Sequence, residues 1–261
     1  IDGATAFLPF YSAATAHLLQ MSQAEASKYI LCSTTDYAYP NLADGKADII
    51  FCLGPSDDQV SYAEQKGVSF EYAPILSEAF VFFVNKDNPV DSVTTEQLRG
   101  IYSGKITNWK ELGGNDEPIL AYQRSEGSGS QTGLYKFVIP KDEVIPSRLA
   151  AVIPTMAGII DVVASYDNSA GGLGYSYLYF VKNQHYDDNI KLLNIEGIAP
   201  TTEAISGGTY PMINTVYAVF RSSEPDGSDV RRIAAWCAGS TAKGIAQELG
   251  YVAYETQEDA K

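Results

Sequence analysis

Short apolar runs alternate along this chain with longer segments in which apolar residues recur at helical spacing. The run 47–53 is almost wholly apolar and is followed by a Gly-Pro pair, which is typical of a strand buried on both faces of a parallel sheet. Before it, a strand is predicted at 28–32 and a helix at 37–44 that a glycine closes. This order of strand, helix and strand predicts a doubly wound α/β domain.

The same alternation continues through the rest of the chain. Further strands are predicted at 1–5, 79–85, 119–123, 171–175 and 214–220, and further helices at 9–21, 96–101, 132–139, 156–166 and 229–249. Thr94 or Thr95 is expected to cap the helix that follows it. No linker rich in Pro, Gly or Ser divides the sequence, so a second domain is expected to be inserted through strand crossings.

Composition and charge narrow the classes of protein to consider. The 261 residues are 45% hydrophobic and 19% charged, which excludes a disordered chain and leaves room for two small domains. The 18 Lys and Arg residues against 32 Asp and Glu give a net charge of −14, and the lack of a basic run argues against a nucleic-acid partner. No apolar run approaches the roughly 20 residues that span a bilayer. We therefore expect a soluble, acidic protein that acts on something small.

The start of the chain and its cysteines bear on the compartment. The chain starts at Ile1 rather than at Met, which fits an exported protein without its signal peptide, although a cloning boundary looks the same. The cysteines are too few and too scattered for a disulfide framework or a zinc site. Cys32 and Cys52 each end a β-like run, so buried thiols are expected, and a bridge between them stays open if the two runs are neighbouring strands.

Three loops share one construction, in which a strand ends, small hydroxyl and glycine residues follow, and a helix begins. They lie at 2–6, 33–35 and 124–131. The N-terminus of a helix exposes unpaired N–H groups and the positive end of the helix dipole, so it favours an anion. In an α/β sheet such loops gather at the carboxyl edge of the strands. A plain turn, or a threonine that only caps a helix, is the alternative at each loop taken alone.

The third loop carries the most chemistry, because a strand-end arginine precedes its glycines and serines. The guanidinium of Arg124 presents a planar fork that suits two oxygens of a tetrahedral oxyanion. Ser128 and Gly129, four and five residues later, are placed to aim a hydroxyl and an N–H at the same point. Glu126 is expected to hold the arginine in place through an ion pair.

Enzyme motifs are not met by these residues. Neither Ser128 nor Ser130 has the glycines of a nucleophile elbow, and no Lys follows the glycines as an NTPase phosphate loop requires. The glycine spacing also misses the dinucleotide fingerprint by one residue. His17 is expected in the core and His185 on the surface, so no catalytic base is evident. A hydrolase that uses Ser128 is the remaining enzymatic alternative, and no cofactor or metal is expected.

At 124–131 the sequence resembles the phosphate-binding proteins of bacterial phosphate ABC importers. The segment 103–114, the opening loop 2–6 and the Gly-Tyr turn at 172–175 resemble the same family in order, so the likeness spans most of the chain. It implies a mixed α/β, two-lobed fold of the type II periplasmic-binding-protein kind, with ligand held in a cleft between the lobes. Lobe 1 is then expected at 1–83 with 200–261, and the inserted lobe 2 at 84–199.

The resemblance also implies ligand residues and a role. The phosphate donors that carry over by position are Thr5, Ala6, Thr35, Arg124, Ser128, Gly129 and Ser130. The family usually places an Asp shortly after its third strand to accept the proton of hydrogen phosphate, and the alignment through Asp48 puts Leu53 there.

The role implied is that of a monomeric, extracytoplasmic binding protein, periplasmic or lipid-anchored, that captures inorganic phosphate for an ABC importer. Two alternatives to that role remain among proteins of the same fold. The first is a binding protein for another oxyanion or small organic anion, and the second is a sensory or scaffolding module.

Overall fold

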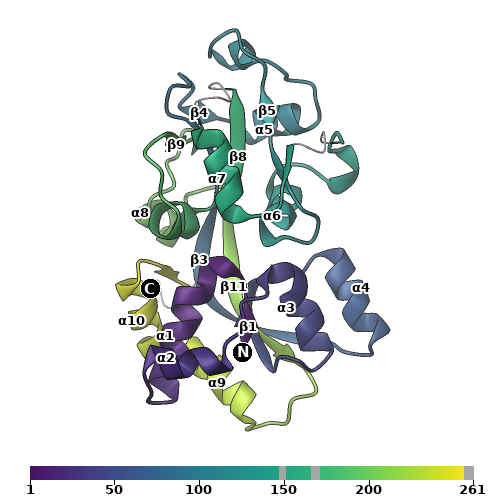
Figure 1. Cartoon of the computed structure of the whole chain (residues 1–261), viewed down its shortest axis with the longest axis vertical. Helices are drawn as coiled ribbons and strands as arrows, with labels where there is room; N and C mark the ends of the chain where they lie inside the picture. The colour runs from purple at the N-terminus through teal and green to yellow at the C-terminus, as the bar shows by residue number, and fades with distance from the viewer. Residues whose placement is uncertain (147–150, 166–170, 256–261) are drawn as a thin grey trace. The chain divides into compact units, whose positions relative to one another are not determined.

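The computed structural model describes residues 1–146, 151–165 and 171–255, and has a mixed α/β arrangement (Figure 1). The chain divides into two compact units that are each discontinuous in sequence. Unit 1 comprises Ile1–Glu78, Gly127–Gly129 and Asn214–Lys261, and unit 2 comprises Ala79–Glu126 and Ser130–Ile213. The lobe bounds expected from the resemblance stay a prediction.

Unit 1 is built around a mixed sheet. Strand β1 (Asp2–Gly3) pairs in parallel with β2 (Ile49–Leu53), and β2 pairs antiparallel with β11 (Ile213–Arg221). The first part of β3 (Phe70–Asn85) lies next to β11 and pairs with β12 (Val252–Ala253). All residues of β2 are buried, as the uninterrupted apolar run predicts. The helices of unit 1 are α1 (Leu8–Leu18), α2 (Gln23–Ala26), α3 (Thr34–Ala43), α4 (Asp57–Gln65), α9 (Asp229–Cys237) and α10 (Ser240–Glu248).

Unit 2 uses the second part of β3 as its central strand. This part pairs antiparallel with β8 (Gly172–Tyr177) and β9 (Ile190–Leu192), and β5 (Leu120–Ala121) lies parallel to β8. Two short parallel pairs, β4–β10 and β6–β7, lie apart from that sheet. The strands of these two pairs are β4 (Ser92–Val93), β10 (Asn194–Ile195), β6 (Gln123–Arg124) and β7 (Val152–Ile153). The helices are α5 (Thr95–Tyr102), α6 (Gly129–Phe137), α7 (Met156–Ala164) and α8 (Thr202–Ser206).

Aromatic side chains fill both cores. In unit 2, Phe80 lies at the centre of a cluster in which its ring centroid is 5.3 Å from that of Phe82, 5.4 Å from Tyr175 and 5.5 Å from Tyr177. In unit 1, Phe10 and Tyr11 of α1 pack on Phe51 of β2. Such rings bury large apolar areas and gain further from edge-to-face contact, so they fix the helices and strands that carry the loops.

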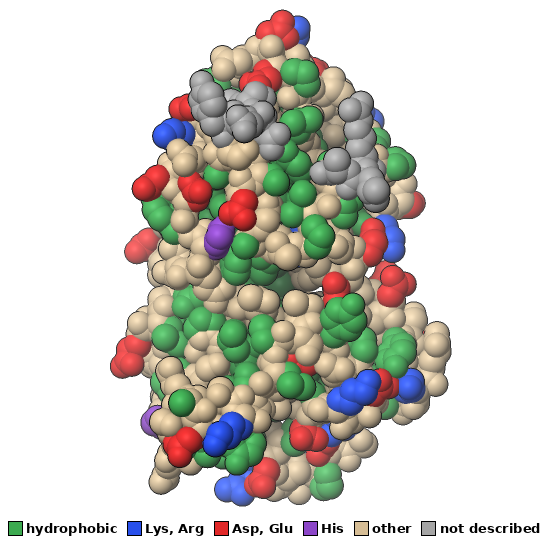
Figure 2. Space-filling view, in the orientation of Figure 1, with side chains coloured by type: hydrophobic (Ala, Val, Ile, Leu, Met, Phe, Trp, Pro, Cys, Tyr) green, Lys and Arg blue, Asp and Glu red, His purple; other side chains and the backbone are tan. Residues whose placement is uncertain are grey.

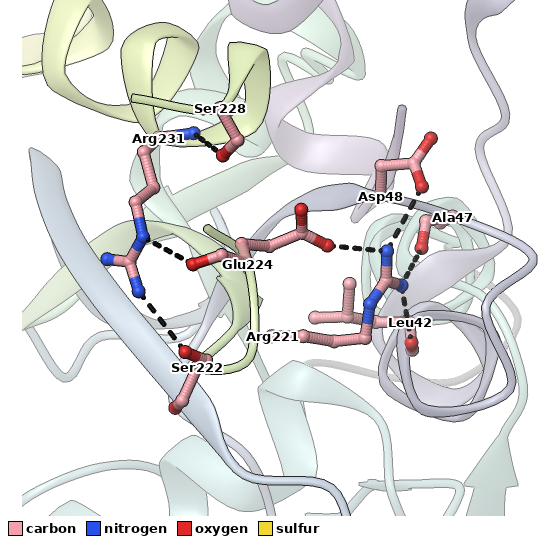
Figure 3. A network of polar contacts seen from close by, with 8 residues as sticks. All are labelled: Leu42, Ala47, Asp48, Arg221, Ser222, Glu224, Ser228 and Arg231. Atoms are coloured by element: carbon pink, nitrogen blue, oxygen red, sulfur yellow. Dashed lines mark hydrogen bonds and ion pairs between the residues drawn. The ribbon is translucent and has the colours of Figure 1, made fainter. Parts of the chain in front are cut away.

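A group of buried and half-buried arginine contacts fastens the end of α3 to β2 and β11 (Figure 3). Arg221, the last residue of β11, donates from Nη1 to the carbonyl oxygens of Leu42 at 3.0 Å and Ala47 at 2.7 Å. Its Nη2 donates to Asp48 at 3.1 Å and Glu224 at 2.8 Å. The connection from α3 into β2 is therefore held by the last residue of the neighbouring strand β11.

Several predicted elements are wrong or differ in their bounds. No strand forms at 28–32: a 3-10 turn occupies Ser27–Tyr29, and Leu31 makes only one backbone bond, to the Ile1 carbonyl. The predicted helix 229–249 is two helices, because Gly239 is extended and begins α10. The predicted strand 119–123 is also divided, since β5 and β6 belong to different sheets. The predicted end of α7 at Tyr166 falls outside the described residues.

Two side-chain predictions are corrected as well. His17 is exposed on α1 and stacks on Trp236 with ring centroids 5.5 Å apart, because the buried face of the helix is made by other residues. Cys32 is exposed, since the strand expected to bury it is absent, and all of Cys32, Cys52 and Cys237 are free thiols.

Within the described ranges, no helix is long and apolar enough to cross a membrane. On the face shown in Figure 2, Lys and Arg side chains form no continuous basic area.

Candidate functional site

The buried carboxylate of Asp2 joins the opening loop to the loop before α3. Its Oδ1 accepts hydrogen bonds from the Gly3 and Ser33 amides, both at 2.8 Å. Its Oδ2 accepts from Asn41 Nδ2 at 2.9 Å. Asp2 is fully buried, so each of these charge-assisted bonds replaces hydration that the carboxylate has lost. Sequence reasoning missed this role, although an acid inside a predicted apolar strand is a usable signal.

Thr5 and Ala6 begin a short 3-10 helix, Thr5–Phe7, that runs directly into α1. The Ala4 amide donates to the carbonyl of Phe51, the middle residue of β2, at 3.0 Å, which fixes the loop on that strand. The Ala6 carbonyl accepts from the hydroxyl of Tyr251 at 2.7 Å. The Sγ of exposed Cys32 lies 3.8 Å from Thr5 Oγ1. The predicted donors of this loop therefore stand at the start of a helical segment.

Thr35 lies in the first turn of α3 and is buried. Its neighbour Thr34 has a φ of +65°, a left-handed conformation that turns the chain into the helix. Burial raises the pKa of the Cys52 thiol, while hydrogen bonds from the Ala4 amide and the Thr35 hydroxyl act in the opposite direction. The opening loop and the Thr35 loop lie side by side in unit 1, because Asp2 of the first accepts a hydrogen bond from the Ser33 amide of the second.

The segment Gly127–Gly129 lies against Thr35. A Cβ atom added to Gly129 would stand 3.0 Å from Thr35 Oγ1 and 3.4 Å from Leu53 Cδ1. A Cβ on Gly127 would stand 2.6 Å from Asp36 Oδ1, and Gly127 has a φ of +76°. Unit 1 therefore brings together three residues that the sequence analysis singled out: Thr35, Gly129 and Leu53.

Arg124 ends β6 in unit 2 and is 6% exposed. Its Nε donates to the Ile153 carbonyl at 2.8 Å and its Nη2 to the Pro154 carbonyl at 2.9 Å. These bonds fix the plane of the guanidinium against the end of β7. The side chain is therefore held in one orientation, and a side chain held in this way loses less conformational entropy when it binds an anion.

The backbone around Arg124 is also held from α6. The Arg124 amide donates to Gln131 Oε1 and to the Tyr175 hydroxyl, each at 2.9 Å, and that hydroxyl donates to the same Gln131 oxygen. Burial raises the pKa of Tyr175, so this hydroxyl keeps its proton as a donor. Ser130, the neighbour of Gln131, is 3% exposed at the start of α6.

Glu126 has partners other than the predicted one. Its carboxylate accepts from the Tyr135 hydroxyl at 2.6 Å and lies 3.2 Å from Lys141 Nζ. Burial, and then the hydrogen bond to Glu126, raises the pKa of Tyr135 to about 12. The guanidinium of Arg124 is held instead by backbone carbonyls, which impose geometry without neutralising its charge.

The chemistry of the predicted set is that of oxyanion recognition. Hydroxyls, helix-start amides and one guanidinium are hydrogen-bond donors of the kind that bind oxyanions. Ser128 is buried at the start of α6, and its assignment as a ligand, like that of the other predicted residues, stays a prediction. In the part of the chain that the structure describes, no cluster of His, Cys, Asp or Glu is arranged to hold a metal ion.

Comparison with known proteins gives the chain a family. The family model described as the PBP superfamily domain matches residues 1–238. The phosphate-binding protein PstS of Bacillus subtilis is 32% identical over 129 residues, which is 49% of this chain and 40% of that protein. Protein SphX of Synechococcus elongatus is 24% identical over 264 residues, covering 96% of this chain and 76% of that protein. The predicted resemblance to phosphate-binding proteins is confirmed.

Solved structures agree on the fold. A substrate-binding protein from Clostridium perfringens, solved with bound phosphate, has a TM-score of 0.75 at 20% identity and covers 97% of this chain and 98% of its own. An ABC-type phosphate transport receptor from Vibrio cholerae has a TM-score of 0.70 at 22% identity, with 96% and 98% covered. At such identities the likeness shows the fold, and the predicted fold class is confirmed. Because the family model matches residues 1–238, the chain belongs to the PBP superfamily, a family of binding proteins rather than an enzyme class.

Proposed function

We propose that this chain captures inorganic phosphate for an ABC importer and performs no chemistry on it. The observation that carries the proposal is the close approach of Gly129 to the Thr35 hydroxyl in unit 1. A Cβ at this position would press on the hydroxyl, so the backbone of Gly129 and the hydroxyl of Thr35, two of the predicted donors, lie close together. The names of the similar proteins, which include phosphate-binding proteins of several bacteria, support the same ligand.

In this proposal two groups of neutral donors and one charged side chain bind the anion. Thr5, Ala6 and Thr35 supply hydroxyl and amide groups at the start of helical segments, where the helix dipole also favours negative charge. Ser128, Gly129 and Ser130 supply the same kind of groups at the start of α6. The guanidinium of Arg124 supplies the one full positive charge, aimed by the carbonyls of β7.

The wider role follows from the same family. We infer that the protein works outside the cytoplasm as a monomer and passes its ligand to importer subunits in the membrane. The proposal includes periplasmic and lipid-anchored forms. Turnover of an ester substrate would contradict it, because the predicted donor set contains no base next to Ser128 to activate that hydroxyl.

A second candidate ligand is a fully ionised oxyanion such as sulfate. Leu53 Cδ1 lies 3.4 Å from the Cβ position of Gly129, so an apolar side chain borders the predicted donors. An alkyl group accepts no hydrogen bond, whereas hydrogen phosphate carries a proton that needs an acceptor. A site of donors alone suits an anion that has no proton to donate.

Calorimetry on protein that has been unfolded, stripped of ligand and refolded distinguishes phosphate from sulfate as the ligand. We expect phosphate to bind with a micromolar or tighter dissociation constant, and sulfate, molybdate and citrate to bind more weakly at the same ionic strength. A preference for sulfate would keep the proposed donors as the binding site and make sulfate, rather than phosphate, the ligand. Absence of binding by all four anions would contradict the proposal and favour a sensory or scaffolding role.

A further inference from the structure

Gln59 is a buried residue whose side chain joins three separate backbone segments of unit 1. It is the third residue of α4 and is 6% exposed. Its Oε1 accepts from the Ser56 amide at 2.9 Å, which closes a capping box at the start of the helix. Its Nε2 donates to the Thr35 carbonyl at 2.9 Å and to the Gly127 carbonyl at 3.4 Å.

The two carbonyls belong to the segments that carry predicted ligand groups. Thr35 supplies its own hydroxyl from the first turn of α3. Gly127 immediately precedes Ser128 and Gly129, has no side chain of its own, and has a left-handed φ of +76°. The amide group of Gln59 therefore links the Thr35 backbone to the 127–129 backbone, in addition to the direct packing of Gly129 on Thr35.

We propose that Gln59 is a positioning residue that presets the anion site by clamping the backbones of Thr35 and Gly127. The inference rests on the proposed function, since it concerns the same donors. With the clamp in place, the amide and hydroxyl donors are ordered before the anion arrives, so binding does not spend free energy on ordering them. Loss of the clamp weakens binding mainly through faster release of the anion.

Gln59→Glu separates the clamp from the helix cap. The carboxylate still accepts from the Ser56 amide, and Glu is itself a good capping-box residue. It cannot donate to the Thr35 and Gly127 carbonyls, and it sets negative charge against both. Gln97 provides the matched control, because it closes a capping box with Thr94 in the same way, with its Oε1 accepting from the Thr94 amide at 2.8 Å.

Phosphate dissociation constants and release rates are measured for the wild type, Gln59→Glu and Gln97→Glu. We expect Gln59→Glu to raise the dissociation constant about 10-fold to 30-fold, as two lost hydrogen bonds imply, with most of the change in the release rate. Gln97→Glu should leave both quantities at the wild-type values. Equal constants for all three proteins, or equal losses in the two variants, would overturn the proposal.

The pH dependence of Gln59→Glu gives a readout that a packing defect does not move. Protonation of the introduced carboxyl restores an O–H donor, and two facing carbonyls favour that neutral form. The ratio of variant to wild-type dissociation constants should therefore fall as the pH is lowered from about 7.5 toward 5, closer to the usual carboxyl pKa. Measuring both proteins at each pH cancels the protonation of phosphate itself. A ratio that stays constant with pH overturns the clamp.

Hydrogen exchange of the ligand-free proteins tests the clamp without relying on phosphate. Faster exchange of the amides at 127–129 in Gln59→Glu than in the wild type, with the rest of unit 1 unchanged, supports the proposal. Unchanged exchange at 127–129 contradicts it, even if the variant is less stable. If the wild type binds no anion at all, the proposed function fails by itself, and this exchange measurement still decides whether Gln59 positions the segment.

Discussion

Replacing Arg124 by Ala tests whether this buried arginine supplies the charge that binds the anion. The substitution removes the guanidinium whose plane is fixed by the Ile153 and Pro154 carbonyls. Truncation of a buried, hydrogen-bonded charge that faces an opposite charge costs about 2–5 kcal/mol of binding free energy. That loss corresponds to a dissociation constant for phosphate about 30-fold to 4,000-fold higher than in the wild type.

The same substitution has a smaller effect on folding. The two carbonyls lose their donor, and unsatisfied buried groups of this kind cost about 1–3 kcal/mol of unfolding free energy. The backbone contacts remain, because the Arg124 amide still donates to Gln131 and Tyr175. A domain of ordinary stability, about 5–15 kcal/mol, tolerates that loss and stays folded. Urea denaturation of the variant measures this cost separately from binding.

Calorimetric titration at fixed ionic strength is the assay, and Arg99→Ala is the control. Arg99 lies on the surface of unit 2 with its Nη2 2.6 Å from a Glu143 oxygen, so its removal changes the net charge equally. We expect Arg99→Ala to bind phosphate as the wild type does. A folded Arg124→Ala protein that keeps the wild-type dissociation constant would refute the assignment of Arg124 to the anion site.

Three further substitutions test the surroundings of the site and the fold. Leu53→Asp should increase the preference for phosphate over sulfate in competition titrations, and an unchanged ratio would show that Leu53 does not face the anion. Gly127→Ala should lower the unfolding free energy by about 1–2 kcal/mol, because its φ of +76° is left-handed and Asp36 Oδ1 lies 2.6 Å from the place of the new Cβ. A melting temperature equal to the wild type would contradict this. Arg221→Leu should lower the unfolding free energy by about 2 kcal/mol or more in urea, since two backbone carbonyls lose their donor, and an unchanged midpoint would show that this network is dispensable.

The parts of the fold that sequence predicted are those that local pattern determines. The run 49–53 has no polar residue, so only a strand covered on both faces accommodates it. Thr94 caps α5 through a bond from the Gln97 amide, an interaction between residues three apart. The first part of β3 was missed, because Pro74 and two glutamates interrupt its apolar pattern and its pairing with β12 comes from the other end of the chain.

The same distinction between local pattern and contacts distant in sequence applies to the candidate site. The placement of Arg124 at the end of a strand, before a glycine-rich turn and a helix, could be predicted because that order has a local signature, and its role as a ligand stays a prediction. The supports were not predicted, since they bridge residues distant in sequence. Asp2 accepts from Ser33, 31 residues away, and Gln59 donates to Gly127, 68 residues away. Neither contact leaves a trace in periodicity or spacing, and each is seen only once the strands and helices are placed.

An acidic chain that binds an anion is not a contradiction, because affinity depends on the donors within a few ångströms of the ligand. Exposed charges farther than about 10 Å are screened at 0.1 M salt, so the net charge of −14 contributes little at the site. Backbone amides and hydroxyls carry no net charge, yet in a dry site they act on an anion almost without screening. Their effect depends on being held in place beforehand. In the proposed site the carboxylate of Asp2 and the amide of Gln59 are supports and not ligand donors, because Asp2 holds the Ser33 amide in the loop before α3 and Gln59 holds the Thr35 carbonyl.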